Sequence, residues 1–198
     1  MKTLPETILE QSRQLPEGGV LAPKNFVHLG SRAAVDQALS RLAKAGKLVR
    51  VARGTYAAPV TSRFGTRPPA PDKVIRAIAE QRGETLVPHG ARAANALGLT
   101  QQVPIKEAFL TTGRSRTMKF GKTEVLVQHA PRWMLALGST LAGEAVRALA
   151  WIGQTHVSEA VGKLHGTLPE SEWNSLLASR TILPTWMAQA IGRENAHA

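Results

Sequence analysis

Two polar side chains in a predicted helix, Arg32 and Gln37, have the chemistry to read DNA bases. An arginine can donate to O6 and N7 of one guanine, and a glutamine can pair with N6 and N7 of one adenine. Both lie in the first half of the helix, which is the half that usually meets base edges. A capping serine can sit beside a phosphate, and a small residue allows contact with a thymine methyl. The predicted base-reading residues are therefore Ser31, Arg32, Ala33 and Gln37.

Lysines and arginines around this helix could hold the DNA backbone. Residues 1–67 contain 11 Lys or Arg and 4 Asp or Glu, which gives this third of the chain most of the total formal charge of +11. Such an excess favours a polyanionic partner, and nucleic acid before membrane. The predicted phosphate contacts are Lys24, Arg41, Lys44, Lys47, Arg50, Arg53, Arg63 and Arg67. A second basic group could extend this footprint or could simply be solvated, and it consists of Arg114, Arg116, Lys119 and Lys122.

Catalytic chemistry finds little support in the sequence. The chain has no cysteine, which excludes disulfides, Cys-ligated metals and Cys nucleophiles. Gly121-Lys122-Thr123 lacks the glycine that a P-loop places five residues before its Gly-Lys pair. The six histidines form no HExxH pair, and the scarce carboxylates form no metal-holding pair. We therefore expect a protein that is not an enzyme, with no catalytic residue, no metal and no cofactor.

The elements that must position the basic residues follow the order of a winged helix-turn-helix. The predicted elements are a helix, a short strand, two helices and a hairpin, over residues 4–14, 20–21, 23–28, 32–45 and 47–59. In the third helix, Val35, Leu39 and Leu42 share one face, which leaves the polar residues on the other. In such a module the third helix enters the major groove, and the hairpin is a wing against the flanking backbone.

The rest of the chain is predicted to form a second domain of helices and strands, followed by a helical C-terminal segment. Residues 61–71 are rich in proline and arginine and are predicted to be a linker. Residues 72–155 contain a helix capped by Asp72, a small-residue helix and three strands, and 156–198 are helical. The expected fold class is α+β: a winged helix-turn-helix domain over 1–60, a small mixed α/β domain and a helical C-terminal extension.

Several segments resemble the AbiEi-type antitoxins of abortive-infection toxin–antitoxin pairs. The stretch GSRAAVDQALSRLAKAGKLVRVARGTYAAP (30–59) is similar to their DNA-binding end, in a pattern that many regulators share. More specific are VPHGARAANALGLTQQVP (87–104) and FLTTGRSRTMKFGKTEVLVQHAPR (109–132). The chain departs from the family at His89, where the antitoxins often have serine or threonine. The resemblance covers roughly residues 5–155.

The resemblance implies a DNA-binding antitoxin that represses its own operon. Its partners would be double-stranded operator DNA with repeats and a nucleotidyltransferase-like toxin, which the second domain counteracts without a stable complex. The alternative is a winged-helix regulator or protein-interaction module of a mobile element with no cognate toxin. The chain has no signal-peptide core and no apolar run of about 20 residues, so we expect a cytoplasmic protein with no membrane partner.

Overall fold

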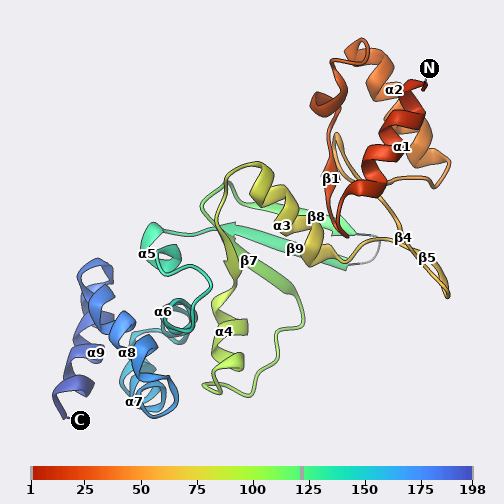
Figure 1. Ribbon diagram of the computed structural model, residues 1–198. Coiled ribbons are helices and arrows are strands. Elements are labelled where there is room, and N and C mark those ends of the chain that lie inside the picture. The colour runs from red at the N-terminus through yellow and green to blue at the C-terminus, as the bar shows by residue number, and fades with distance from the viewer. Residues whose placement is uncertain (1, 121–122, 198) are drawn as a thin grey trace. The chain divides into compact units, whose positions relative to one another are not determined.

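The computed structural model describes residues 2–120 and 123–197, and it combines helices with small sheets (Figure 1). This mixture agrees with the expected α+β class. The molecule divides into two compact units. Unit 1 is Met1–Glu84 with Thr117–Val125, and unit 2 is Thr85–Arg116 with Leu126–Ala198. The chain therefore leaves unit 1 and returns to it once.

Unit 1 begins with helical segments and an antiparallel three-stranded sheet of order β1-β3-β2. The elements are α1 (Leu4–Gln14), β1 (Val20–Leu21), the 3-10 helix η1 (Pro23–Phe26), α2 (Arg32–Lys44), β2 (Val49–Ala52) and β3 (Thr55–Ala57). Their apolar side chains form one core, in which Ile8, Phe26 and Leu39 are completely buried. The predicted helices over 4–14 and 32–45 are confirmed, whereas the predicted helix over 23–28 is a short 3-10 segment.

Local sequence explains where α2 begins and ends. The Ser31 hydroxyl accepts a hydrogen bond from the backbone N–H of Ala34 at 3.2 Å, which satisfies one of the free donors of the first turn. Val35 and Leu39 are buried and attach the helix to the core. Gly46 follows the last turn with φ of +70°, a backbone conformation that costs other residues energy. The same turn directs the chain into β2.

Residues 60–67 form a second hairpin where a linker was expected. β4 (Val60–Ser62) pairs antiparallel with β5 (Gly65–Arg67), and α3 (Pro71–Gln81) follows. The prediction that Asp72 caps α3 is wrong, because Ala70 is the N-cap and Asp72 lies in the first turn. The helix starts earlier than expected because proline in its first turn already has a helical φ and needs no N–H partner.

Helix α3 packs against the turn that precedes β1. A side chain at Gly18 would place its Cβ 2.5 Å from the Cβ of Lys73, so glycine is required for this close approach. The side-chain amide of Gln81 donates to the Val20 carbonyl at 2.8 Å. Glu17 accepts from the backbone N–H of Ala70 at 3.3 Å. Unit 1 therefore extends to Glu84, past the expected domain boundary at residue 60.

Glu17 joins three segments of unit 1 and should make its stability sensitive to acid. The carboxylate binds the Lys73 ammonium, the Ala70 N–H and the Arg67 guanidinium, which lower the pKa of Glu17 to about 2. A depressed folded pKa stabilises the fold above the unfolded value of 4.5, and this contribution disappears as the pH falls from 4.5 towards 2. We expect Glu17→Gln to lower the melting temperature at neutral pH and to match the wild type near pH 2. Thermal melts across this range test it.

The control for this measurement is Glu80→Gln, which changes an exposed carboxylate on the same helix that receives the Glu17 contacts. A difference between Glu17→Gln and wild type that is independent of pH would contradict the assignment, because the loss would then not follow the titration of Glu17.

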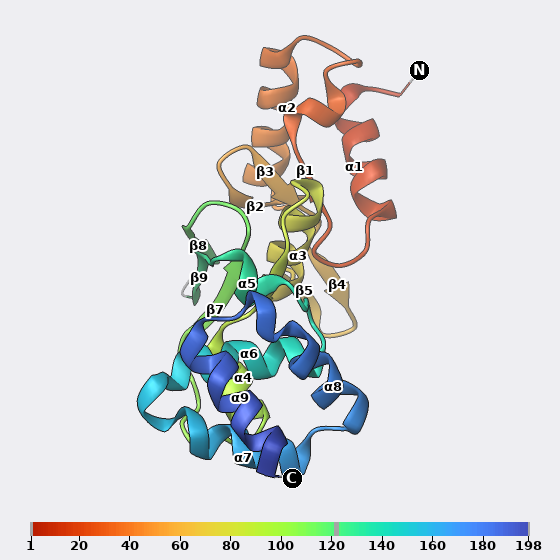
Figure 2. The same ribbon diagram turned by 90° about the vertical axis from the view of Figure 1, so that its left-hand side faces the viewer.

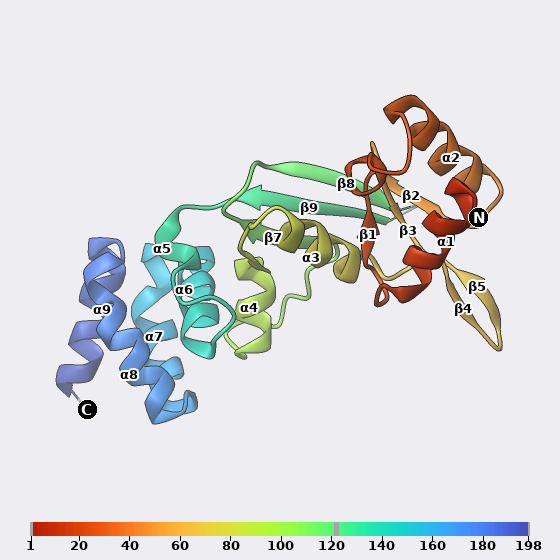
Figure 3. The same cartoon turned by 45° about the horizontal axis from the view of Figure 1, so that its top comes forward.

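A four-stranded sheet has the order β6-β7-β9-β8, and its strands β7, β9 and β8 lie side by side in Figure 3. Residues 117–125, which include most of β8 and the start of β9, are assigned to unit 1, and the other strand residues to unit 2. The strands are β6 (Leu86–Pro88), β7 (Glu107–Thr111), β8 (Arg116–Phe120) and β9 (Thr123–His129). Helix α4 (Gly90–Ala96) follows β6. His89 caps α4, because its Nδ1 accepts from the N–H of Ala91 at 3.2 Å. Burial lowers the pKa of His89, which keeps the ring neutral and able to accept.

The C-terminal part of unit 2 is a group of packed helices (Figure 2). They are α5 (Arg132–Leu135), α6 (Leu141–Ile152), η2 (Gln154–His156), α7 (Val157–Thr167), α8 (Glu170–Ala178), η3 (Ser179–Ile182) and α9 (Thr185–His197). Leu149, Leu164, Leu176 and Met187 are completely buried in their shared core. The indole of Trp173 is also buried there.

Helices α4 and α6 approach closely through small residues. Gly90, Ala93 and Ala94 of α4 are buried against a stretch of α6 that includes Ala148. A Cβ at Gly90 would lie 2.4 Å from the carbonyl oxygen of Arg147, which belongs to the rigid backbone of α6. The glycine therefore sets the distance between the two helices.

We expect Gly90→Ala to destabilise unit 2 by about 1–3 kcal/mol, because the methyl group must push the two helix backbones apart. The matched control is Gly166→Ala, at a helical position of α7 where an added Cβ meets nothing within 4 Å. That change should stabilise the protein by about 0.4–1 kcal/mol. Denaturant unfolding of both variants measures the difference, and equal stability would show that α4 and α6 can move apart freely.

Candidate nucleic-acid interface

Helix α2 separates its apolar residues from its polar ones. Val35, Leu39 and Leu42 point into the core, and every predicted DNA contact on this helix is exposed: Arg32, Ala33, Gln37, Arg41 and Lys44. The separation follows from the 3.6-residue period of the helix. One face of α2 is thus free to bind a partner that can accept hydrogen bonds and carries negative charge.

Two of the predicted base-reading residues already have local partners. The Nε of Arg32 lies 3.0 Å from Asp36 Oδ2, one turn further along α2. Both side chains are largely exposed, and such surface pairs contribute little to stability, so a stronger acceptor could take over Arg32. Ser31 uses its hydroxyl to cap the helix, which leaves it as a positioning residue. Among the residues that the structure describes, the Gln37 side chain has neither an ion-pair nor a capping contact of this kind.

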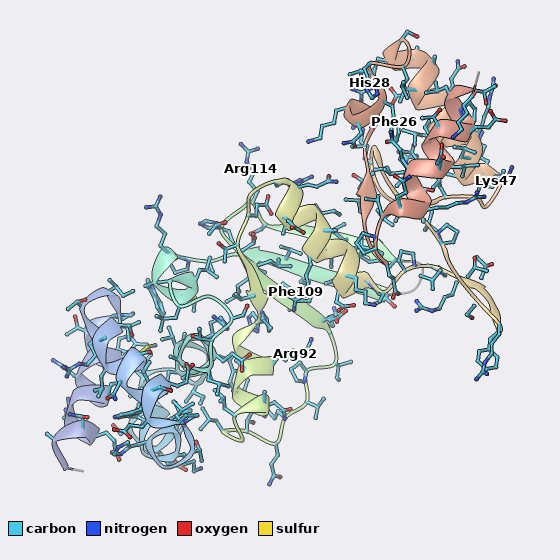
Figure 4. The ribbon with its side chains drawn as sticks, in the orientation of Figure 1. Phe26, His28, Lys47, Arg92, Phe109 and Arg114 are labelled. Atoms are coloured by element: carbon cyan, nitrogen blue, oxygen red, sulfur yellow. The ribbon has the colours of Figure 1, made fainter. Side chains whose placement is uncertain are left out.

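The β2–β3 hairpin carries its two arginines outward. Arg50 and Arg53 are exposed, and Gly54 completes the turn with φ of +66°. Lys47 is exposed in the turn between α2 and β2 (Figure 4). Lys24 is exposed on η1. Together with α2, these cations give unit 1 several exposed positive charges on separate elements.

The predicted contacts on the second hairpin differ from each other. Arg63 lies over the ring of its neighbour Phe64, with the guanidinium carbon 4.7 Å from the ring centre. Arg67 binds Glu17 at 3.1 Å between Nη2 and Oε1, and its Nη1 donates to the Pro68 carbonyl. Arg67 therefore fastens the base of the hairpin, and its charge is partly compensated.

The members of the second basic group differ in their exposure. Arg114 is exposed and points away from the sheet at the turn between β7 and β8 (Figure 4). Arg116 is half-buried and donates to the Arg114 carbonyl at 3.3 Å. Lys119 is exposed further along β8, in the part of that strand that belongs to unit 1. Lys122 lies outside the described residues.

His129 holds the turn that carries Arg114. The Nδ1 of His129 is 2.9 Å from the carbonyl oxygen of Gly113, and its backbone N–H donates to the Ser115 hydroxyl at 2.9 Å. Nδ1 therefore carries the proton, because a carbonyl can only accept. These contacts give His129 a structural role in the turn.

Three exposed residues that sequence reasoning passed over lie close in the chain to the predicted contacts. They are Arg13 in the last turn of α1, His28 before α2 and Phe64 at the tip of the second hairpin. Arg13 and His28 carry no motif that would distinguish them from other surface residues. Phe64 had a signal, because an aromatic residue between Arg63 and Gly65 is unusual in a polar turn.

The described residues also bear on two other features, a metal site and a membrane-spanning helix. Within residues 2–120 and 123–197, no group of three His, Asp or Glu side chains is arranged to hold a metal ion. No helix in the same ranges is long and apolar enough to cross a membrane.

The fold and the site define a basic α+β protein of two compact units, one of which has an exposed cationic helix face. The chain belongs to the family of unknown function DUF6088, which matches residues 7–172. A comparison with curated proteins found no match. Among solved structures, the chain is similar to the crystal structure of the RV2827C protein from Mycobacterium tuberculosis, with 15% identity and a TM-score of 0.48. The similarity covers 98% of this chain and 82% of that protein.

Proposed function

We propose that the protein binds double-stranded DNA through a winged helix-turn-helix in unit 1. The observation that carries the proposal is α2, which buries its apolar face and exposes Arg32, Gln37 and Arg41. The helix lies beside an antiparallel β1-β3-β2 sheet whose β2–β3 turn carries Arg53. This element order is typical of winged helices, in which the helix enters the major groove and the hairpin contacts the backbone.

Base reading and backbone binding would involve different residues. Arg32 would exchange Asp36 for the O6 and N7 atoms of a guanine, and Gln37 would pair with an adenine. The cations on the β2–β3 hairpin and at the end of α2 would neutralise phosphates and would bind every sequence alike. If its binding site overlaps the promoter of its own gene, the bound protein would exclude the polymerase and repress transcription.

The resemblance to AbiEi-type antitoxins extends the proposal to a second activity. In that reading, the DNA-binding part represses the operon, and segments 87–104 and 109–132 counteract a nucleotidyltransferase-like toxin without a stable complex. These segments belong mostly to unit 2, and the DNA contacts on α2 and β2–β3 all belong to unit 1. The separation supports two activities that can be changed independently.

Co-expression with the toxin tests this division. We expect Arg32→Ala with Arg41→Ala to derepress a reporter fused to the operon promoter and still to protect cells when supplied from an unrelated promoter. The exposed residue Arg193 on α9 provides a control, since Arg193→Ala should change neither readout. If the double variant failed to protect at normal protein levels, DNA binding and neutralisation would be one activity. If repression occurs and no neighbouring toxin gene exists, the protein is a regulator without a cognate toxin.

A further inference from the structure

The tip of the β4–β5 hairpin presents an aromatic ring to solvent. Phe64 is 85% exposed, and the Arg63 guanidinium lies over its ring. The Ser62 hydroxyl accepts from the N–H of Phe64 at 3.2 Å and donates to the carbonyl of Gly65 at 3.3 Å. Gly65 has φ of +112°, which a side chain would strain. The tip is thus shaped by its own hydrogen bonds, and the hairpin projects from the rest of unit 1 (Figures 1 and 3).

A cationic pocket lies along the same hairpin. It has a volume of about 320 Å³ and includes the cross-strand pair Thr61 and Thr66 from the hairpin. Arg13 from α1 and Lys47 from the α2–β2 turn also line it, and no carboxylate does. Hydroxyl groups beside two cations are the donors that a phosphate group requires.

The charges indicate what this surface binds. The hairpin sequence, residues 60–67, contains two arginines and no acidic residue. Arg63 has no carboxylate partner in the part of the chain that the structure describes. A protein partner of ordinary surface charge would not require cations without carboxylate partners both at the hairpin tip and in the pocket. A polyanion with flat apolar groups accounts for both, and the bases of DNA are such groups.

We infer that the β4–β5 hairpin is a second DNA contact, in which Phe64 wedges against a base step of the duplex. This inference rests on the proposed DNA binding by unit 1. Phe64 would enter from the minor groove and partly unstack a flexible step, which bends the duplex. Arg63 would follow into the same groove, and the Arg13–Lys47 pocket would hold a backbone phosphate. Lys47, predicted from the sequence as part of the wing, would thus serve this second contact.

Full-length protein and a duplex from the promoter region upstream of its own gene provide the test. Anisotropy measures affinity, and energy transfer between dyes on the two duplex ends measures bending. We expect Phe64→Ala to bind about tenfold more weakly and to lose the bending signal, whereas Phe64→Trp retains both. Arg13→Ala and Lys47→Ala should each reduce the salt slope by about one. The control for the ring is Ile105→Ala, which removes a fully exposed apolar side chain of unit 2.

The outcomes separate this inference from the proposed function. If wild-type protein binds no duplex, DNA binding itself is wrong and the inference falls with it. If wild type binds and Phe64→Ala has unchanged affinity and bending, only the wedge is wrong. If Phe64→Ala changes the oligomeric state in ultracentrifugation but leaves bending intact, the tip is a protein contact and the inference is overturned. Melting curves check that each variant is folded.

Discussion

Raising the salt concentration from about 50 mM to about 200 mM should weaken duplex binding roughly 1000-fold. If about six phosphates are neutralised, the logarithm of the binding constant falls with the logarithm of salt at a slope near −5. Unit 1 has enough exposed cations to neutralise about six phosphates. Exposed cations of unit 1 for which the described residues provide no carboxylate partner include Lys24, Arg41, Lys44, Lys47, Arg50, Arg53 and Arg63.

Anisotropy titrations at four or five salt concentrations measure the slope. Lys44→Ala removes one exposed cation of α2 and should make the slope shallower by about one. Arg193→Ala, in unit 2, should leave it unchanged. A wild-type slope flatter than about −2 would contradict a footprint made of these side chains.

Arg32→Ala and Gln37→Ala should each cost about 1–3 kcal/mol on the operator and much less on random DNA. Each variant removes one bidentate pairing with a base, and that pairing exists only on the correct sequence. Arg50→Ala and Arg53→Ala are the matched comparison, because loss of a phosphate contact weakens all duplexes alike. Parallel titrations of operator and random duplex give the four differences.

The ion pair within α2 allows a sharper version of this experiment. Asp36→Asn removes the carboxylate that lies 3.0 Å from Arg32. It should strengthen binding, since Arg32 no longer exchanges a partner and a negative charge leaves the surface that faces the phosphates.

Equal losses on operator and random DNA for all four alanine variants would show that α2 does not lie in the major groove as proposed.

The predicted site can be traced to one well-patterned segment. Spacings of four and three between Val35, Leu39 and Leu42, after a capping serine and before Gly46, are enough to predict α2 and its exposed face. Such a helix can be predicted from local sequence because its hydrogen bonds and its cap join residues about one turn apart. The contacts made by Arg32 and Gln37 with bases stay a prediction, because they depend on DNA.

The segment after β3 was harder to predict. Residues 61–71 have the composition of a linker, with three prolines and no regular apolar alternation. Two strands of three residues each carry too weak a pattern to be distinguished from a loop. Their pairing depends on hydrogen bonds that composition does not report, including those of Ser62 at the tip.

By itself, the sequence determined the helices and hairpins with strong local patterns, the basic excess of residues 1–67 and the absence of cysteine chemistry. Only the tertiary structure decided which segments belong together. Glu17 binds Lys73 across 56 positions of sequence, and Gly18 admits the backbone of α3, so a helix assigned to the second domain belongs to unit 1. The physical reason is that these contacts depend on the close approach of segments that are distant in the sequence. The local sequence around Glu17 and Gly18 contains no pattern that predicts which segment they contact.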